Sequence, residues 1–341
     1  MCIRDSIESV QMNHSGNPGA PITLAAYPGH KPAIQHPYNT SIVNMASGGG
    51  TASVGWLIFE GFEIYSTLAS GNNSAFGIGL HNVHDTIIRR NTIHHSRHGI
   101  LGTGKNVKID RNTVYHNGAF DVCATDIKQC NQDHGIYGTG SNWVVINNLI
   151  YDNLAYGIQI AAYPFDANLY PDAGYAGASG WLVANNTIAY NNWRAGIILW
   201  QSGATNGTFI NNIIYQNALK SGSTQGIEFY GSGAGHLVQN NSFYGRTAPF
   251  LDTAQSYTAS GNLMNSDPLF INAGSSPPPS PNFQVQSGSP TINAGLTVSQ
   301  VTTDLLGIVR PQAGAYDIGA YEGSSTSSNT PPSPPKNLTV R

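Results

Sequence analysis

Histidines gather in one stretch of the chain and are the first candidates for chemistry. Seven of the 11 histidines lie between positions 81 and 134. Imidazole titrates near neutral pH, so it is the side chain best suited to move a proton there. His98 and His134 each stand directly before a Gly-Ile pair, with Arg97 and Asp133 directly before them. This repeated arrangement predicts that two histidines, a cation and a carboxylate occupy equivalent positions in neighbouring structural units.

A repeated unit explains why these positions are equivalent. Gly-Ile pairs recur along the chain and begin at Gly77, Gly99, Gly135, Gly157, Gly196 and Gly226. An asparagine followed two residues later by an aliphatic or aromatic residue recurs between them, at Asn91, Asn112, Asn148, Asn186, Asn212 and Asn241. Apolar residues alternate in short runs within each unit, which is typical of strands and too short for helices.

Three short strands and a fixed turn residue make one coil of a solenoid. Strands of successive coils would pair about 4.8 Å apart. Asparagine tolerates left-handed backbone at turns, and stacked asparagines can bond amide to amide. The leucine-rich-repeat pattern and its helical segment are missing from the units. We therefore predict an all-β fold, a single-stranded right-handed parallel β-helix over residues 7–323, with coils of about 22 residues.

Two insertions interrupt the repeat and predict a groove. Segment 118–133 precedes one Gly-Ile strand, and segment 161–181 follows the next. Long loops on a rigid scaffold are common places for function, and these two should flank one face. Rings of the second insertion, among them Trp181, are suited to stack on sugars. The side chains expected to contact a ligand there are His81, Arg97, Gln159, Tyr163, Trp200 and Glu228.

The units resemble those of secreted right-handed β-helix proteins, a superfamily with pectate lyases, alginate lyases, mannuronan epimerases and some glycoside hydrolases. The stretches that carry the resemblance are 16–35, 88–100, 146–160, 184–199, 210–217 and 289–323. The resemblance implies a secreted bacterial protein that acts on an extracellular polysaccharide. The opening MCIRDS, residues 1–6, resembles a translated sequencing adapter from a metagenome, so we expect any signal peptide to be missing.

The chemistry that this resemblance favours is β-elimination on a uronic-acid polymer. Such a polysaccharide lyase neutralises the substrate carboxylate, removes the C5 proton and protonates the leaving glycosidic oxygen. The base is expected to be His134 or His98, beside Asp133, with Lys128 as second choice, and Tyr137 is the expected general acid. Calcium would neutralise the carboxylate if oxygen ligands cluster, and the candidates are Asp126, Asp166 and Asp172.

Other functions stay open. Mannuronan epimerases carry a Tyr-Gly-[Phe/Ile]-Asp-Pro-His strand; here the similar place keeps His81 but has Phe76 and Gly79 for the tyrosine and aspartate, which counts against that activity. A glycoside hydrolase needs two carboxylates about 5–10 Å apart, which Asp133 with Asp166 or Asp172 would supply. A non-catalytic carbohydrate-binding or adhesion β-helix would have the rings without convergent titratable groups.

Composition excludes some partners. The net charge is −3, without blocks of like charge, so no nucleic-acid partner is expected. No apolar run reaches the roughly 20 residues of a membrane span, so no membrane-spanning segment is expected. We also expect the protein to be a monomer. Cys123 and Cys130 are predicted to form a disulfide in an oxidising compartment.

The C-terminal part has a different composition. Residues 262–323 are expected to cap the solenoid, and their charged side chains are expected to form a structural ion-pair set of Asp304, Arg310, Asp317 and Glu322. Residues 324–335 form a Ser/Pro linker, and 336–341 resemble the start of a fibronectin type III module.

Overall fold

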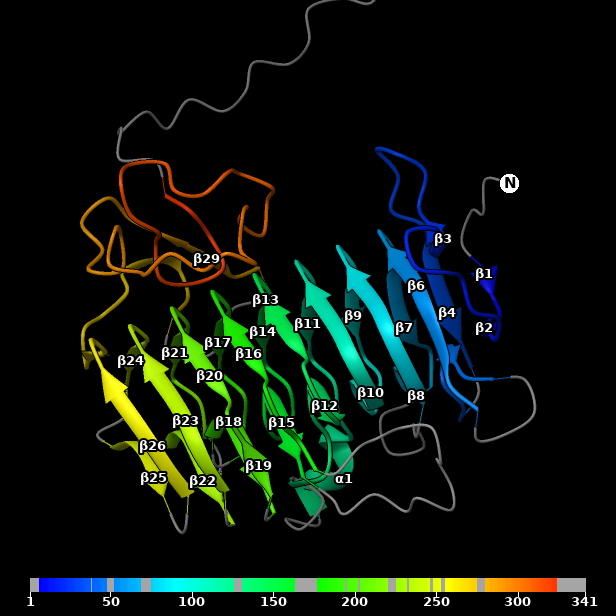
Figure 1. Cartoon of the computed structure of the whole chain (residues 1–341), viewed down its shortest axis with the longest axis horizontal. Coiled ribbons are helices and arrows are strands. Elements are labelled where there is room, and N and C mark those ends of the chain that lie inside the picture. Colours follow the sequence, from blue (N-terminus) through cyan, green and yellow to red (C-terminus); the bar gives the residue numbers. More distant parts are fainter. Residues whose placement is uncertain are drawn as a thin grey trace, which may run out of the picture.

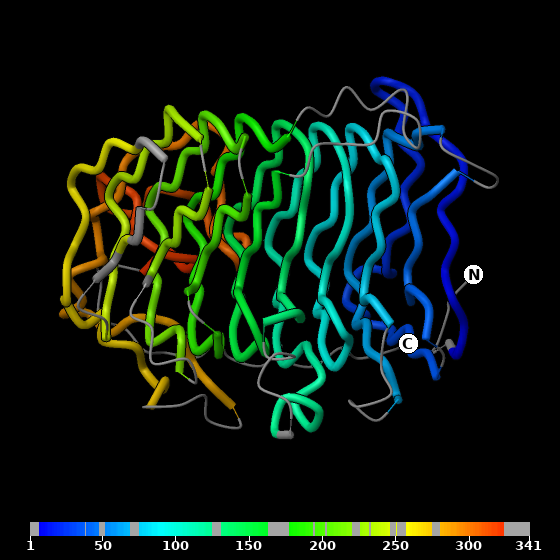
Figure 2. Tube along the Cα trace, turned by 90° about the horizontal axis from the view of Figure 1, so that it is seen from below, coloured from blue at the N-terminus to red at the C-terminus, as the bar shows by residue number. Residues whose placement is uncertain are grey.

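The computed structural model describes residues 6–37, 39–47, 52–68, 75–125, 131–162, 177–193, 195–201, 203–219, 225–231, 233–245, 248–252, 255–274 and 280–323. In these residues the chain winds in coils of short strands stacked along one axis (Figures 1 and 2). Strands of successive coils pair in parallel and in register. The predicted parallel β-helix is confirmed.

The strands form three faces. The face that holds the Gly-Ile pairs, called the Gly-Ile face, contains the first halves of β8 (Phe76–Arg89) and β10 (His98–Asp110) with β2 (Val10–Met12), β5 (Val43–Met45), β12 (Ile136–Thr139), β15 (Ile158–Ala161), β18 (Ala195–Trp200), β22 (Gln225–Tyr230) and β25 (Ala248–Asp252). The second face contains the second halves of β8 and β10 with β3 (Ile22–Ala25), β6 (Val54–Glu60), β13 (Val144–Ile146), β16 (Leu182–Ala184), β19 (Ala204–Thr205), β20 (Thr208–Ile210), β23 (Gly233–Gln239) and β26 (Gln255–Ser260).

The third face is a sheet of ten strands: β1 (Ser6–Ile7), β4 (Ala33–His36), β7 (Glu63–Ser66), β9 (Thr92–His94), β11 (Thr113–Tyr115), β14 (Leu149–Tyr151), β17 (Thr187–Ala189), β21 (Ile213–Tyr215), β24 (Ser242–Tyr244) and β27 (Leu263–Met264). The first insertion contains the short helix α1 (Phe120–Thr125), which the strand pattern did not predict. The hairpin of β28 (Phe270–Asn272) and β29 (Asn282–Val285) is antiparallel.

The Gly-Ile pairs have a steric cause. Their isoleucines point inward, and each is 0% exposed: Ile78, Ile100, Ile136, Ile158, Ile197 and Ile227. A Cβ on Gly99 would lie 2.5 Å from the carbonyl oxygen of Gly135, and one on Gly135 would lie 2.7 Å from that of Gly157. Only glycine therefore allows successive coils to approach this closely, which places the preceding residue at the same point of every coil.

The repeated asparagines form the predicted amide ladder. Nδ2 of Asn112 donates to Oδ1 of Asn148 at 3.1 Å, and Nδ2 of Asn148 donates to Oδ1 of Asn186 at 3.0 Å. The residue before each has left-handed backbone, as at Arg111 (φ 57°) and Asn147 (φ 55°). Buried amides that bond one another in this way leave few polar groups unsatisfied and fix the turn between the second and third faces.

A second ladder at the turn into the Gly-Ile face was not predicted. It links Asn117 to Asn153, Asn153 to Asn191, and Asn191 to Asn217, each by an Nδ2–Oδ1 bond of 2.9 Å. Ser96 takes the equivalent place in the earlier coil, and its N–H donates to Oδ1 of Asn117 at 3.1 Å. This ladder therefore fixes the turn that carries the histidines of interest.

The C-terminal segment packs along the side of the coils (Figure 1). Phe270 and Phe283 cover the outside of the third face, and Val301 and Tyr316 cover the second. Tyr190 Oη donates to the carbonyl of Ala273 at 2.8 Å. These contacts are lateral, whereas we expected the segment to cover the open end; a capping role stays a prediction.

The expected ion-pair set of this segment is confirmed for Arg310 and Glu322, while Asp304 and Asp317 accept backbone N–H groups beside them. Arg310 Nη1 lies 2.6 Å from Glu322 Oε2, and both side chains are buried. Asp304 Oδ2 accepts the N–H of Glu322 at 3.0 Å, and Asp317 Oδ1 accepts that of Asn293 at 2.7 Å. These groups bond one another and the backbone, so they hold the segment in shape.

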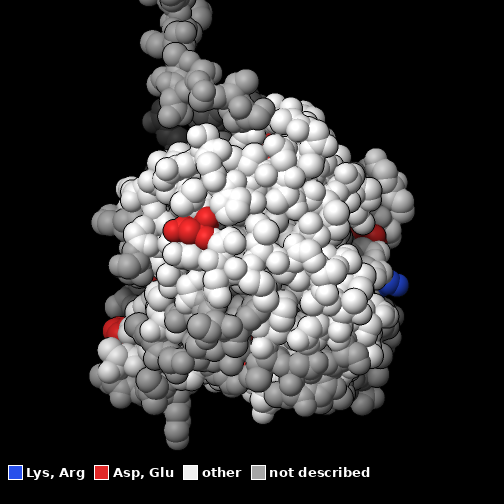
Figure 3. All heavy atoms as spheres, turned by 90° about the vertical axis from the view of Figure 1, so that its left-hand side faces the viewer, with Lys and Arg blue, Asp and Glu red and all other residues white. Residues whose placement is uncertain are grey.

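Several predictions concern residues that the structure does not describe. Cys123 is buried on α1, but Cys130 lies outside the described residues, so the disulfide stays a prediction. The adapter-like residues up to 5, the linker and the fibronectin-like end also lie outside them. No helix in the described part of the chain is long and apolar enough to cross a membrane. Seen from the end that carries β25 and β26, the described atoms are nearly all uncharged (Figure 3).

Candidate functional site

His98 and His134 lie together at the edge of the Gly-Ile face, as their spacing predicts. Their ring centroids are 5.4 Å apart, and Tyr137 on β12 lies 5.3 Å from His134 and 5.9 Å from His98. Phe76 and Tyr156 extend the row by one coil on each side, with ring centroids 5.4 Å from His98 and His134 respectively. Both histidines are buried, while Tyr137 is half-buried.

The backbone of the next coil determines the protonation of both histidines. The His134 N–H donates to Nδ1 of His98 at 3.2 Å, and the Tyr156 N–H donates to Nδ1 of His134 at 3.4 Å. A neutral imidazole carries one proton, so each ring must carry it on Nε2. Both rings therefore present an N–H donor, and their lone pairs are engaged by the backbone.

Burial also disfavours the charged form of these rings. It lowers the pKa of His98 to about 3, with Arg97 as a further cause, and lowers the pKa of His134 well below its ordinary value. At neutral pH both are neutral hydrogen-bond donors. This geometry contradicts the expected role of His98 or His134 as general base, because Nδ1 is occupied and Nε2 already holds the proton.

Asp133 and Arg97 form a cross-coil ion pair beside the histidines. Arg97 Nε donates to Asp133 Oδ1, and Oδ2 accepts the N–H of Ala119 at 2.8 Å. Burial raises the pKa of Asp133, and the Ala119 N–H and Arg97 oppose that shift. Asp133 is 0% exposed, and both of its oxygens are engaged by Arg97 and Ala119, so it links the start of the first insertion to the Gly-Ile face instead of taking the catalytic role that we expected.

The outward column of the Gly-Ile face has the predicted register. Leu101, Tyr137 and Gln159 follow one another on β10, β12 and β15, and Ile198 pairs with Glu228 further along. The column is not an open wall, because Gln159 is 6% exposed and Glu228 is 0% exposed. The expected surface role of Glu228 is therefore corrected, and that of Gln159 stays a prediction.

Aromatic side chains continue the site along the Gly-Ile face. Tyr156 packs with Ile198, Trp193 and Trp200. Trp200 stacks on Tyr230, with ring centroids 4.5 Å apart and planes 6° from parallel, and Tyr230 is 38% exposed. Trp200 is thus placed where a sugar could contact it. Tyr156 and Trp193 were missed because neither stands at a position that the repeat singles out.

Trp181 contradicts its expected place in a sugar-binding loop. Its ring stacks on Trp143, with centroids 4.7 Å apart, and is 2% exposed in the core. Its Nε1 donates to the carbonyl of Gly140 at 2.8 Å. The ring fills the inside of the coil because burying its large apolar surface stabilises the folded protein more than leaving it in water.

Other predicted site residues lie apart or outside the description. His81 is exposed on β8, in the coil before His98. The residues outside the described part of the chain are Lys128, Tyr163, Asp126, Asp166 and Asp172. No three His, Cys, Asp or Glu side chains among the described residues are placed to hold a metal ion, so calcium stays a prediction.

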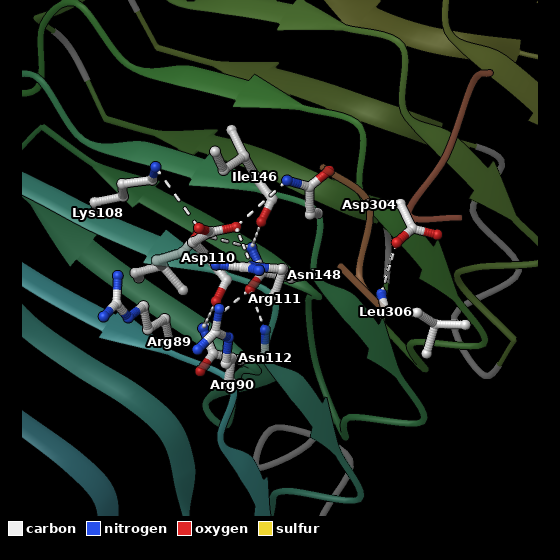
Figure 4. Close-up of polar contacts among 12 residues, drawn as sticks. Arg89, Arg90, Lys108, Asp110, Arg111, Asn112, Ile146, Asn148, Asp304 and Leu306 are labelled. Atoms are coloured by element: carbon white, nitrogen blue, oxygen red, sulfur yellow. Dashed lines mark hydrogen bonds and ion pairs between the residues drawn. The ribbon is translucent and has the colours of Figure 1, made fainter. Parts of the chain in front are cut away.

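Four cations on the second face and in the turns that follow it are engaged in ion pairs, and Figure 4 shows those of Lys108 and Arg111. Lys108 Nζ lies 3.6 Å from Asp110 Oδ2, and Arg111 Nε lies 3.5 Å from Asp110 Oδ1. Arg89 and Arg90 pair with Glu60 in the same way. Asp110 is buried, and its carboxylate offsets the positive charge of Lys108 and Arg111, as Glu60 does for Arg89 and Arg90.

The buried histidines predict a loss of stability in mild acid. Their pKa is lowered in the folded protein, so the unfolded chain binds more protons below 6.5. The free energy of unfolding should therefore fall as the pH drops from 6.5 towards about 4.5, by about 1.4 kcal/mol per pH unit for each histidine. Urea unfolding measures the slope. His134→Gln should reduce it and exposed His14→Gln should not; equal slopes in all three proteins would contradict the prediction.

Comparison with known proteins agrees with this fold. The family model described as right handed beta helix region matches residues 46–264. No curated protein sequence matches the chain.

Solved structures with similar folds include three carbohydrate-active proteins. Pectate lyase Pel9A is 15% identical, with a TM-score of 0.48 over 94% of this chain and 84% of that chain. Pectate lyase Bsp165PelA from Bacillus sp. N165, in complex with trigalacturonate, is 19% identical, with a TM-score of 0.46 over 80% and 82%. The mannuronan C-5 epimerase AlgE4 A-module of Azotobacter vinelandii is 14% identical, with a TM-score of 0.42 over 74% and 86%. At these identities the similarity concerns the path of the chain alone.

Proposed function

The chain belongs to the right-handed β-helix family, and within that fold we propose that it is a polysaccharide lyase, which cleaves a uronic-acid polymer by β-elimination. The observation that carries the proposal is the packing of the Tyr137 ring against the rings of His98 and His134, whose Nδ1 atoms accept backbone N–H groups. A secreted protein would meet such a polymer outside the cell.

Each group has a separate role in this reaction. The Nε2–H groups donate to the substrate carboxylate and stabilise the negative charge that spreads onto it when the C5 proton leaves. The electron pair of the C–H bond forms the C4–C5 double bond, and the bond from C4 to the glycosidic oxygen breaks. The Tyr137 hydroxyl gives its proton to that oxygen. Lys128 is then the remaining candidate for the base, and it lies outside the described residues.

The alternatives are less well supported by the described side chains. A binding module needs rings but no cluster of proton-donating groups, whereas this site has both. A hydrolase needs two accessible carboxylates about 5–10 Å apart. Asp133 is buried and paired with Arg97, and its expected partners Asp166 and Asp172 lie outside the described residues.

A substrate panel tests the proposal directly. The protein would be incubated with polygalacturonate, alginate, glycosaminoglycans, neutral glucans and xylans. Two products would be measured in each reaction: unsaturated uronates, by their near-ultraviolet absorbance, and new reducing ends. We expect absorbance to rise with one of the uronate polymers. Loss of that rise with a chelator would support calcium held by Asp126, Asp166 and Asp172. New reducing ends without absorbance would overturn the lyase in favour of a hydrolase, and silence in both readouts would favour the binding module.

A further inference from the structure

A second polar cluster lies on the outside of the third face, before the turn that leads to the candidate site. Glu63 Oε1 lies 3.0 Å from His94 Nε2, and His94 Nδ1 lies 2.7 Å from Nδ1 of His95. The rings of His95 and His116 follow at 4.7 Å, and His116 Nδ1 lies 2.7 Å from Asp152 Oδ2. Three histidines are thus arranged in line between two carboxylates.

The bond between His94 and His95 holds a single proton. Two nitrogens at 2.7 Å form a hydrogen bond only when one carries a proton and the other accepts it. When Glu63 is ionised, it accepts the Nε2–H of neutral His94, so Nδ1 of His94 is the acceptor and Nδ1 of His95 is the donor. If both rings became charged, two N–H groups would face each other and the bond would be lost.

The chain segment that contains His94 and His95 continues directly into residues of the candidate site. His94 ends β9, the turn continues from His95 to Arg97, and His98 begins β10. His95 has left-handed backbone (φ 53°), and its N–H donates to the carbonyl of His116 at 3.1 Å. Side-chain bonds that hold His95 therefore also hold the turn that leads to Arg97 and His98.

We propose that Glu63, His94, His95, His116 and Asp152 form a proton-sensitive clamp, which positions Arg97 and His98 when it is closed and releases the turn in acid. The clamp rests on the proposed function only for its effect on activity. His94 and His95 are positioning residues, since they act on the substrate through the turn.

The surroundings of the clamp agree with release in acid. The groups that face it are Glu63 and Tyr65 from β7, Tyr115 from β11, and Lys31, His116 and Asp152. Burial, with the neighbouring His116 and His94, lowers the pKa of His95 to about 4, and burial lowers the pKa of His94. A ring freed from the clamp would regain a pKa near 6.5, so acid between these values favours the open form.

Hydrogen exchange of the amides at residues 95–98, corrected for intrinsic rates, tests the clamp. In the wild-type protein we expect exchange to be at least about tenfold faster at pH 4.5 than at pH 7. His95→Gln keeps a side-chain donor for His94 but takes no proton, so its exchange should change much less. Glutamine suits this turn, because Gln216 has the same left-handed backbone at the equivalent position. Exposed His14→Gln is the matched control.

A second readout links the clamp to the active site. If the chain is a lyase, His95→Gln should shift the acid limb of the kcat/KM profile to lower pH while kcat/KM at pH 7 stays within about twofold. Equal acceleration of exchange in wild type and His95→Gln, or none in either, would overturn the clamp. Exchange does not depend on turnover, so a chain that is inactive on every polymer would remove the proposed function and leave this test intact.

Discussion

Tyr137→Phe is expected to lower kcat/KM for β-elimination by about 10²–10⁴-fold. The change removes the hydroxyl and keeps the ring that packs against His98 and His134. A positioned general acid contributes a factor of this size, because the leaving oxygen would otherwise depart as an alkoxide. Initial rates of absorbance increase on the active uronate polymer measure the loss.

Two further variants make this result specific. Tyr115→Phe removes a tyrosine hydroxyl from the third face and should leave kcat/KM unchanged within about twofold. His134→Asn keeps an oxygen near the Nδ1 position to accept the Tyr156 N–H but has no donor at the Nε2 position, and should cost about 10²–10³-fold. If Tyr137→Phe kept wild-type activity, the assignment of the acid would be wrong. If His134→Asn alone kept it, the donor role would be wrong.

Asn148→Ala is expected to lower the free energy of unfolding by about 3 kcal/mol or more. Asn148 is 0% exposed and donates to the carbonyls of Ile109 and Ile146 at 2.9 Å, besides its bonds to Asn112 and Asn186. Alanine leaves these buried groups without partners, and each such group costs about 1–3 kcal/mol. The midpoint and slope of urea unfolding measure the effect.

The matched control is an asparagine outside the ladder. Asn44 donates to Gln11 Oε1 at 2.8 Å near the surface, where water can replace the lost bond, so Asn44→Ala should cost less than about 1 kcal/mol. Equal losses in the two variants would show that the ladder adds nothing beyond an ordinary surface bond.

The spacing of the candidate residues proved more informative than their types. The shared position before Gly-Ile correctly predicted that His98 would lie near His134, but it did not predict the ion pair of Arg97 with Asp133. It did not predict that Nδ1 of each histidine accepts a backbone N–H, because those donors come from adjoining coils. The role of the histidines therefore changed from base to donor, although their places were right.

Burial was the property that local sequence determined least well. Gln159 and Glu228 stand at outward positions and are nonetheless buried, and Trp181 lies in the core although its segment is an insertion. The side chains that cover a position come from neighbouring coils and from insertions. The lengths of the insertions do not follow the repeat, so the repeat cannot predict what they cover. The clamp at His94 and His95 was missed for the same reason, since Glu63 and Asp152 belong to other coils.

The amino-acid sequence by itself determined the solenoid, the places of the first asparagine ladder and the residues that stack from coil to coil. It could do so because a strict repeat places the same residue at the same height in every coil, and a one-residue slip would expose the inward isoleucines. The tertiary structure alone decided which of the stacked groups are buried, which ring nitrogen carries the proton, and where the C-terminal segment packs. Those properties depend on contacts between residues far apart in the chain, whose free energies no repeat encodes.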